Sequence, residues 1–408
     1  MSFEPIAIIG RSCVLPGALS PEALWEAVFQ GRDLVTGVDS ERWRLSAKNA
    51  LGTIDDSKDR AWSDRGGYVD GFESIFDPTG FALPAEEILK LDPLFQWILH
   101  TSREALREGG VQDTSRAGAI IGNLSFPSSS LSSYAERSWL GEDLANTAGV
   151  PQTAPENRFM SGLPAHLLAQ ALELGDLAFA LDAACASSLY AIKLACDRLH
   201  DRSADLMLAG AVNRADDLFL HIGFCALKAL SPSGQSRPFH KDADGLVPAN
   251  GAGMVLLKRL GDAQRDGDPI LGVIRAVALS NDGRGKGFLA PSKEGQIRAM
   301  RSAYELAGLD PGDISLLECH ATGTTVGDKT EIESMSAVFE GSEDLPVGSL
   351  KSNMGHLITA AGVAGLIKVI EAMKAGVRPA SLHASEKNEA LENTPIRVID
   401  QNEAWLCD

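Results

Sequence analysis

Short apolar runs alternate along this chain with segments whose apolar residues recur at helical spacing. Near the N-terminus, Pro5 to Gly10 (PIAIIG) predicts a buried strand of the parallel type, and Ser20 to Phe29 predicts a helix with Ser20 at its N-cap. Further strands are predicted over residues 117–122, 177–183, 204–212, 253–260, 270–280, 314–319 and 346–350. Further helices are predicted over residues 84–108, with a brief interruption at Asp92 and Pro93, over residues 187–199 and 293–307, and within 351–375. The serine-rich residues 123–157 are too irregular to predict an element. This alternation predicts an α/β protein with a mostly parallel sheet covered on both faces.

One junction between a strand and a helix has unusual residue types. The change from a short apolar run to helical spacing falls at Cys185. The neighbours of this cysteine are all small: Ala183, Ala184, Ala186, Ser187 and Ser188. Small residues allow a sharp turn and leave room for a substrate, and the N–H groups at a helix start favour a thiolate. A lone cysteine is more often a buried structural residue, but this setting predicts that Cys185 is a nucleophile.

Two histidines have comparable positions in the predicted fold. His320 follows the strand predicted over residues 314–319, and His356 lies in the turn-like sequence KSNMGH before the last long helix. Groups beyond the carboxyl ends of parallel strands converge on one crevice, so these histidines and Cys185 can meet there. Taken singly, each histidine is more often a structural residue. A cysteine together with two histidines predicts covalent acyl chemistry.

Hydroxyl and basic side chains flank the two histidines. Thr322 and Thr324 offer hydroxyls within HATGTTVGD, beside glycines that allow close backbone approach, and this suits a polar, flexible substrate arm. Lys351 lies five residues before His356 and could keep the region positive, which favours a neutral histidine that donates a hydrogen bond. Lys351 could equally be a solvated lysine in a loop. The local pattern leaves both interpretations of this lysine open.

Composition narrows the class of protein. The chain has 37 basic and 55 acidic residues and a net charge of −18, which argues against general binding to nucleic acid or anionic membranes. The six cysteines, at positions 13, 185, 196, 225, 319 and 407, show no spacing typical of disulfides or zinc sites, so we expect a reducing compartment and no metal. We find neither a secretory signal nor an apolar run long enough to cross a membrane. We therefore expect a cytoplasmic protein that does not insert into membranes.

The chain divides most naturally near the polar residues 265–269. We predict a first half over residues 1–260, which carries Cys185, and a second half over residues 266–408, which carries both histidines. The segment over residues 346–375 has the same plan as the cysteine segment, with a strand, a small-residue turn and a long apolar helix. This likeness indicates an internal duplication.

Three motifs together resemble the β-ketoacyl synthase family: DAACASS with Cys185, ECHATGTTVGD with His320, and KSNMGH with Lys351 and His356. The likeness extends from Pro5 to about Ala380 and includes SPSGQSRPF, KDADG and the LDP near position 92. It implies a thiolase fold of the α/β class, with two similar halves in a five-layer αβαβα arrangement, and a homodimer or heterodimer. The residues of these motifs are most similar to those of ketosynthase domains of iterative polyketide or polyunsaturated fatty acid synthases.

The resemblance also implies a reaction and its partners. Cys185 would accept an acyl group from the phosphopantetheine arm of an acyl carrier protein, and its N–H would form half of an oxyanion hole. A malonyl carrier protein would then enter with its arm contacting Thr322 and Thr324. His320 and His356 would donate hydrogen bonds to the thioester oxygen as CO₂ leaves, and Lys351 would support the site. No cofactor is expected to stay bound permanently.

Three departures from the family pattern keep other interpretations open. Pro248, Ala249 and Asn250 stand where the family has a Gly-Glu-Gly run, and Ala321 follows His320 where the family has glycine. The chain also ends at NEAWLCD, before the closing glycine-rich segment of the family, so we expect part of a longer synthase or an impaired protein. One alternative function is a non-catalytic or impaired partner subunit that shapes chain length, and Cys185 argues against it. Another is a Cys-His thioester hydrolase, which two histidines and Lys351 disfavour.

Overall fold

Six strands form the main sheet of the molecule. The computed structural model describes residues 3–39, 42–43, 45–56, 59–124, 126–284 and 290–405. The strands of this sheet are β1 (Ile6–Val14), β4 (Ala117–Asn123), β5 (Ala178–Leu181), β6 (Leu206–Asn213), β7 (Gly251–Arg259) and β8 (Gly272–Ile274). Their order across the sheet is β5-β4-β6-β7-β1-β8. Strands β6 and β7, which come later in the chain, therefore lie in the centre of the sheet between β4 and β1.

Strand direction changes in the middle of this sheet. Strand β4 pairs in parallel with β5 and β6, and Ala119 of β4 lies opposite Ala178 and Leu208. Strand β7 is antiparallel to β6 and β1, and β8 is antiparallel to β1. The prediction of a parallel-type strand at residues 5–10 was therefore wrong. Every residue of β1 is buried, and burial on both faces gives the same continuous apolar run whichever way the neighbours point.

A second, smaller sheet lies on the side of the C-terminal half. It contains β9 (Leu317–Glu318), β10 (Leu345–Gly348) and β12 (Ile396–Val398), with β10 in the centre and both pairings parallel. Strands are predicted over residues 270–280 and 314–319, but the structure has only the shorter β8 and β9 there. Two small ladders complete the described strands: β2 (Thr36–Gly37) with β3 (Arg65–Gly66), and β11 (Val377–Arg378) with β13 (Glu403–Ala404).

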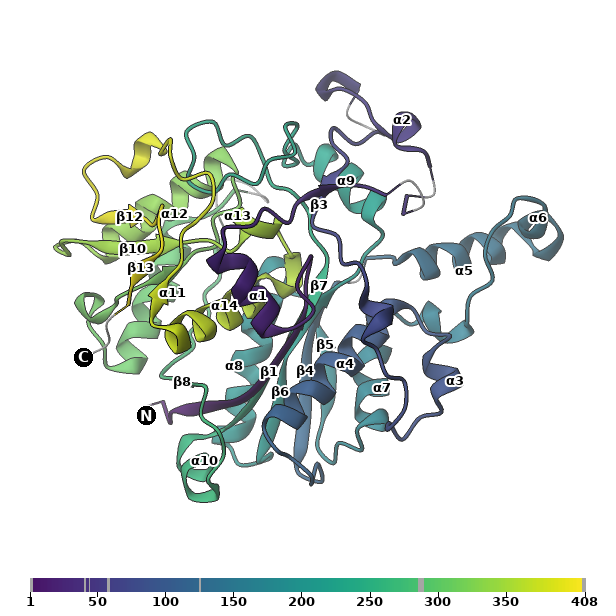
Figure 1. Ribbon diagram of the computed structural model, residues 1–408, viewed down its shortest axis with the longest axis horizontal. Coiled ribbons are helices and arrows are strands. Elements are labelled where there is room, and N and C mark those ends of the chain that lie inside the picture. Colours follow the sequence, from purple (N-terminus) through teal and green to yellow (C-terminus); the bar gives the residue numbers. More distant parts are fainter. Residues whose placement is uncertain are drawn as a thin grey trace.

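Helices separate and cover the two sheets. Helices α8 (Ser187–His200) and α14 (Ala361–Ala375) lie between them, α4 (Pro93–Glu108) and α7 (Leu163–Ala171) cover the outer face of the main sheet, and α11 (Lys293–Ala307) and α12 (Thr325–Val338) cover the second sheet. Figure 1 shows this succession from the second sheet on the left to α4 and α7 on the right. The other described helices are α1 (Pro21–Phe29), α2 (Ala47–Ala50), α3 (Ala85–Ile88), α5 (Ser129–Leu140), α6 (Glu142–Thr147), α9 (Asp217–Ala226), α10 (Leu260–Asp266) and α13 (Lys351–Met354). The predicted five layers are thus present.

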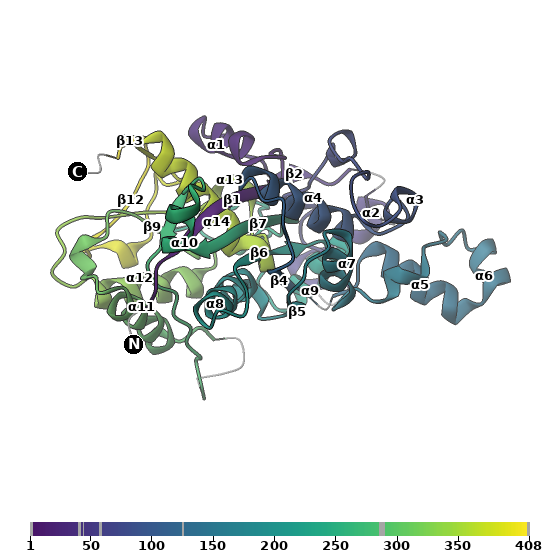
Figure 2. The same ribbon diagram turned by 90° about the horizontal axis from the view of Figure 1, so that it is seen from below.

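Local signals place several helix boundaries as predicted. The Ser20 hydroxyl accepts a hydrogen bond from the N–H of Ala23 and caps α1. The helical region over residues 84–108 is broken before Pro93, where the Asp92 carboxylate accepts from the N–H of Leu94 and starts α4. The serine-rich residues, for which no element was predicted, form α5 and α6, an arm that extends away from the body of the molecule (Figures 1 and 2).

The two central helices begin with the same unusual turn. A 3₁₀ turn over Ala184–Ala186 precedes α8, and a 3₁₀ turn over Ile358–Ala360 precedes α14. The first residue of each turn has a left-handed backbone, with φ of 48° at Ala184 and 49° at Ile358. This shared geometry agrees with the duplication that the sequence indicates. In the first half the turn carries Cys185.

Candidate active site

Cys185 lies at the strained turn between β5 and α8. The Ser187 hydroxyl accepts from the N–H of Ala183 at 2.9 Å and donates to the carbonyl of Ala184 at 2.7 Å. The Asp182 carboxylate accepts from the N–H of Ala184 at 3.0 Å. These three bonds hold the left-handed residue in place, since such a conformation costs about 1–2 kcal/mol for a residue other than glycine. The tight strand-to-helix turn predicted at Cys185 is therefore present.

His356 contacts the thiol directly. Its Nε2 lies 3.0 Å from Sγ of Cys185, and the residue is 2% exposed. The backbone of His356 is held on both sides, because its N–H donates to the carbonyl of Val247 and its carbonyl accepts from the N–H of Ala249. Within the described part of the chain, the buried Nδ1 has no hydrogen-bond partner. No partner therefore fixes the tautomer, and Nε2 can either accept the thiol proton or donate a hydrogen bond.

His320 brings a second imidazole to the same place. Its ring centroid lies 5.3 Å from that of His356, with the rings edge to face. The carboxylate of Glu331 on α12 accepts from the N–H groups of His320 and Ala321 at 2.8 and 2.7 Å. His320 lines the same cavity as Cys185 and is itself exposed to solvent. The structure thus brings together one sulfur and two imidazoles from distant segments.

Lys351 is buried at the first residue of α13. It is 7% exposed, and its Nζ lies 3.5 Å from the carbonyl of Cys319. The alternative of a solvated lysine in a loop is therefore wrong. Burial lowers the pKa of Lys351, and the carboxylates of Glu318 and Glu331 oppose this shift.

Burial sets the charge state of the catalytic candidates. It lowers the pKa of His356 well below the ordinary value, and the nearby His320 and Lys351 add to this effect. Burial and then Lys351 also lower the pKa of His320. Both imidazoles are therefore neutral near pH 7. Burial raises the pKa of Cys185 by more than Lys351 and the backbone at the helix start lower it. The helix start thus acts in the predicted direction, but the resting residue is a thiol.

A cavity of about 290 Å³ lies against apolar side chains of the two central helices, and His356 is not among its lining residues. Cys185, His320 and Lys351 line it together with Glu318 and Cys319, and Leu189, Leu366 and Val369 supply apolar walls. Thr322 and Thr324 do not line this cavity. Their hydroxyls lie 3.1 Å from each other in the loop that follows His320.

Sequence reasoning missed the carboxylates that hold this loop. Asp328 on α12 is fully buried, and its oxygens accept from the N–H groups of Thr322, Gly323 and Phe239 at 3.0, 3.2 and 2.8 Å. Burial raises the pKa of Asp328 to about 7. Asp328 and Glu331 lie three residues apart on one helix, and this spacing in GDKTEIE was the only available signal.

Asn250 and Ala321, two residues that depart from the family pattern, are both accommodated by their surroundings. Asn250 is buried, accepts from the N–H of Val69 at 3.0 Å and donates to the carboxylate of Asp217 at 2.9 Å. Ala321 is buried in the core between the second sheet and its outer helices. Neither residue leaves a buried polar group unpaired at its position.

Possible metal ligands occur away from the cysteine. Among the described residues, His240, Asp242 and Glu386 have ligand atoms within 4.8 Å of one another. Lys241 pairs with Glu386 beside them, and an ammonium opposes a bound cation. The expectation that the protein has no metal stays a prediction.

A cysteine and two neutral histidines at the central layer of a five-layer αβαβα architecture define the thiolase class of proteins. Within that class, the family model described as "Beta-ketoacyl synthase, N-terminal domain" matches residues 3–263. The model described as "Beta-ketoacyl synthase, C-terminal domain" matches residues 271–385. The chain belongs to the β-ketoacyl synthase family. The resemblance and the thiolase fold predicted from the motifs are both confirmed.

Similar proteins are large polyketide synthases. The PKS-NRPS hybrid synthetase ATPKS of Aspergillus niger is 37% identical over 99% of this chain, which covers 22% of that protein. The phenolphthiocerol synthesis polyketide synthase type I Pks15/1 of Mycobacterium marinum is 35% identical over 98% of this chain, which covers 19% of it. The chain thus spans about a fifth of the length of these relatives.

Solved structures of ketosynthases have the same fold. The PfaC keto synthase-chain length factor superposes with a TM-score of 0.93 at 35% identity, covering 98% of this chain and 45% of that one. The oxazolomycin ketosynthase domain OzmH KS7 of Streptomyces albus JA3453 gives a TM-score of 0.87 at 31% identity, with coverage of 98% and 68%. In the described part of the chain, every helix is too short or too polar to span a bilayer. The predicted bounds of the halves, 1–260 and 266–408, stay predictions.

Proposed function

We propose that this chain is a β-ketoacyl-[acyl carrier protein] synthase that joins a Cys185-bound acyl chain to malonyl carrier protein by decarboxylative Claisen condensation. The observation that carries the proposal is the 3.0 Å contact between Cys185 Sγ and His356 Nε2, with the His320 ring beside it. A hydrolase needs one base and an orienting acceptor for that base. Two neutral imidazoles beside one sulfur instead suit a reaction in which a thioester oxygen needs two hydrogen-bond donors.

In the first step Cys185 takes the acyl group. The Cys185 thiol loses its proton as its sulfur attacks the acyl carrier thioester, and a proton leaves with the carrier thiol. Lys351 lies close enough to favour the transient thiolate. The N–H of Cys185, at the start of a helical turn, would stabilise the oxyanion of the tetrahedral intermediate.

In the second step a carbon–carbon bond replaces the carbon–sulfur bond. The malonyl thioester loses CO₂, and its carbonyl oxygen gains enolate character. His320 and His356, neutral and protonated at Nε2, donate to that oxygen, and each such donor is typically worth about 3 kcal/mol. The carbanion then attacks the acyl carbonyl on Cys185, and the sulfur leaves as a thiolate that takes a proton from water.

The partner in both steps is an acyl carrier protein with its phosphopantetheine arm. Thr322 and Thr324 fit a polar arm, because the N-cap position of α12 leaves the Thr324 hydroxyl without a helix N–H to accept. Gly323, between them, has a left-handed backbone with φ of 78°, and its N–H and carbonyl are paired with Asp328 and Gly245, which fixes the loop that carries the two hydroxyls. The proposal includes a cytoplasmic location, with neither nucleic acid nor a membrane as partner.

A second candidate function is a partner subunit that shapes chain length without condensing. It is favoured by the similarity to the PfaC keto synthase-chain length factor, whose name pairs a chain length factor with a keto synthase. The two candidates differ in one property. A condensing enzyme becomes acylated at Cys185, whereas a subunit that only shapes chain length does not require acylation of this residue.

Mass measurement of the intact protein tests this difference. We expect one acyl adduct after incubation with acyl carrier thioesters, mapped to the peptide that contains Cys185. The adduct should be absent in Cys185→Ser and present in Cys225→Ala, which removes a buried cysteine elsewhere. A wild-type protein that stays unmodified while correctly folded would favour the partner-subunit function.

A further inference from the structure

A buried ion pair lies beside the candidate site, and the proposed reaction does not use it. Glu318 is the last residue of β9, two positions before His320, and lines the same cavity as Cys185. Its Oε2 lies 2.7 Å from Nζ of Lys368 on α14. The two side chains are 15% and 3% exposed. A pair so little hydrated is costly to form, so its position next to the reactive thiol calls for an explanation.

The contacts of Glu318 tie three segments of the site together. Its Oε1 accepts from the N–H of Leu350, the residue before Lys351, at 2.7 Å. Gly365, one turn before Lys368, leaves the space in which Glu318 lies, since a Cβ there would be 3.0 Å from its Cγ. The carboxylate thus contacts the segments that carry His320, Lys351 and the cavity wall.

Charge in this cavity is closely balanced. The groups that face Lys351 are Glu318, Glu331, Cys185, Cys319, His320 and His356. Those that act on Cys185 include Lys351 and Asp182. Without Lys368, the Glu318 carboxylate would keep only the hydrogen bond from the N–H of Leu350. Of the charged groups around the cavity, Lys351 would then be the cation left to balance it. A free negative charge in the cavity disfavours a thiolate there.

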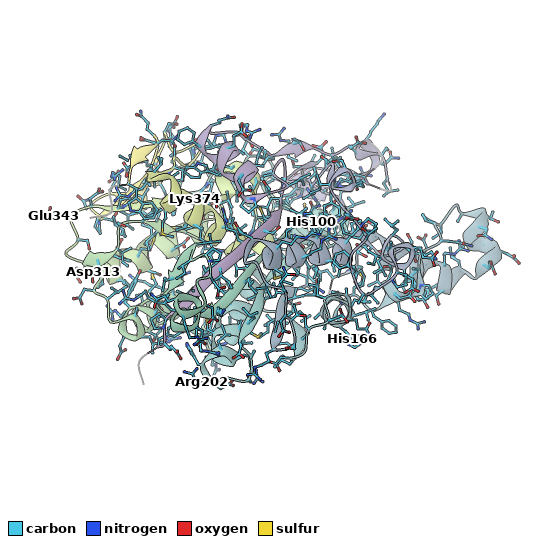
Figure 3. All side chains as sticks on the ribbon, turned by 60° about the horizontal axis from the view of Figure 1, so that its bottom comes forward. His100, His166, Arg202, Asp313, Glu343 and Lys374 are labelled. Atoms are coloured by element: carbon cyan, nitrogen blue, oxygen red, sulfur yellow. The ribbon has the colours of Figure 1, made fainter. Side chains whose placement is uncertain are left out.

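We propose that Lys368 is a positioning residue that neutralises Glu318, and so keeps the charge around Cys185 suited to thiolate formation. Lys368 is not simply a basic residue of a solvated helix face. Lys374, farther along α14, is exposed at the surface (Figure 3), whereas Lys368 is 2% exposed. The proposal rests on the proposed function, but its test measures the reactivity of the Cys185 thiol directly.

The test is the pH dependence of Cys185 alkylation by iodoacetamide, followed by peptide mass mapping in the full chain. Lys368→Met should move the midpoint to higher pH by about 0.5–1 unit, because it leaves Glu318 uncompensated. Glu318→Gln should move the midpoint to lower pH, because it leaves Lys368 uncompensated. The double variant Glu318→Gln, Lys368→Met removes both charges and should return the midpoint close to that of the wild type.

The opposite shifts distinguish charge balance from a merely structural role. Lys374→Met removes a lysine from the solvent-exposed part of the same helix and should leave the midpoint unchanged. If both single variants shift the midpoint in the same direction, or neither shifts it, the proposal is wrong. Should Lys368→Met fail to fold, Glu318→Gln and the double variant still decide the question. No carrier protein is needed, so loss of condensation alone leaves this result unaffected.

Discussion

Ala184 has a left-handed backbone immediately before the cysteine of the candidate site. The strain is maintained by hydrogen bonds of Ser187 on both sides of the turn. A strained turn of this kind aims the following side chain away from the strand and toward the helix start. The position of the sulfur beside His356 therefore depends on a serine hydroxyl two residues farther along the chain.

The roles of the two histidines lead to a prediction about separate steps. His320→Ala and His356→Ala should keep acylation of Cys185 within about tenfold of the wild type, and should lower decarboxylative condensation by roughly 100-fold or more, because each removes a donor to the developing enolate. Adduct mass measures the first step, and CO₂ release from malonyl carrier protein measures the second. His166→Ala, on the outer surface of α7 (Figure 3), is the control. If either site variant lost acylation first, the assigned roles would be wrong.

The sequence located the reactive side chains better than it located their supports. Cys185, His320 and His356 each have a neighbourhood of small residues or a strand end that marks them. Asp328 and Glu331 instead accept hydrogen bonds from backbone N–H groups, and such partners leave no trace in residue types. The charge state of Cys185 was also beyond prediction, since the depth of burial depends on the whole fold.

At the scale of elements, β4 and α8 approach each other unusually closely at the nucleophile turn. A Cβ on Gly122 would lie 2.6 Å from Cβ of Ser187. Gly122→Ala should therefore push the start of α8 outward, lower the free energy of unfolding by about 1–3 kcal/mol and slow acylation of Cys185. Denaturant unfolding and adduct mass measure the two effects. Gly261→Ala, which meets open space, should show neither loss. Equal stability of the two variants would contradict the close packing.

Asp328 ties the loop after His320 to α12 and leads to a prediction about pH. Burial raises the pKa of this carboxyl from 3.8 to about 7, so ionisation is costlier in the folded protein than in the unfolded chain. Its contribution to stability is greatest below pH 3.8 and declines as pH rises to about 7. Asp328→Asn should remove that decline. The free energy of unfolding of the wild type, relative to that of the variant, should therefore fall by at least about 1 kcal/mol between pH 3.8 and about pH 7.

Unfolding in urea at several pH values measures this difference. Glu343→Gln, which changes an exposed carboxylate at the edge of the second half (Figure 3), should show no such trend. A difference that rises with pH would mean that the three backbone donors outweigh burial.

Elements with local signals were predictable, and elements that depend on distant pairing were not. Ser20 and Asp92 cap their own helices, so both boundaries follow from neighbouring residues. The direction of β1 is fixed by β7, far away in the chain, and the apolar run carries no information about it. Strands β8 and β9 are shorter than their apolar segments, because strand length depends on the partner and not on the segment alone.

At the scale of the whole molecule, the main sheet has an open edge. Strand β5 is the last strand on its side, and Phe179 within it is 36% exposed. Unpaired backbone groups at a sheet edge readily pair with another chain. The family resemblance implies a dimer, and the open edge leads us to expect that it forms through β5. Phe179→Lys should shift sedimentation toward monomers, and Val326→Lys, at another exposed apolar residue, should not. A monomeric wild type would contradict this expectation.

The central claim is that one sulfur and the two imidazoles beside it form a carbon–carbon bond. The most direct test supplies the acylated protein with malonyl carrier protein and follows the β-ketoacyl thioester and CO₂ together. The account predicts one β-ketoacyl product for each CO₂ released by the acylated protein, and no β-ketoacyl product in Cys185→Ser. Acylated protein that releases only the free acid, with no β-ketoacyl product, would contradict it.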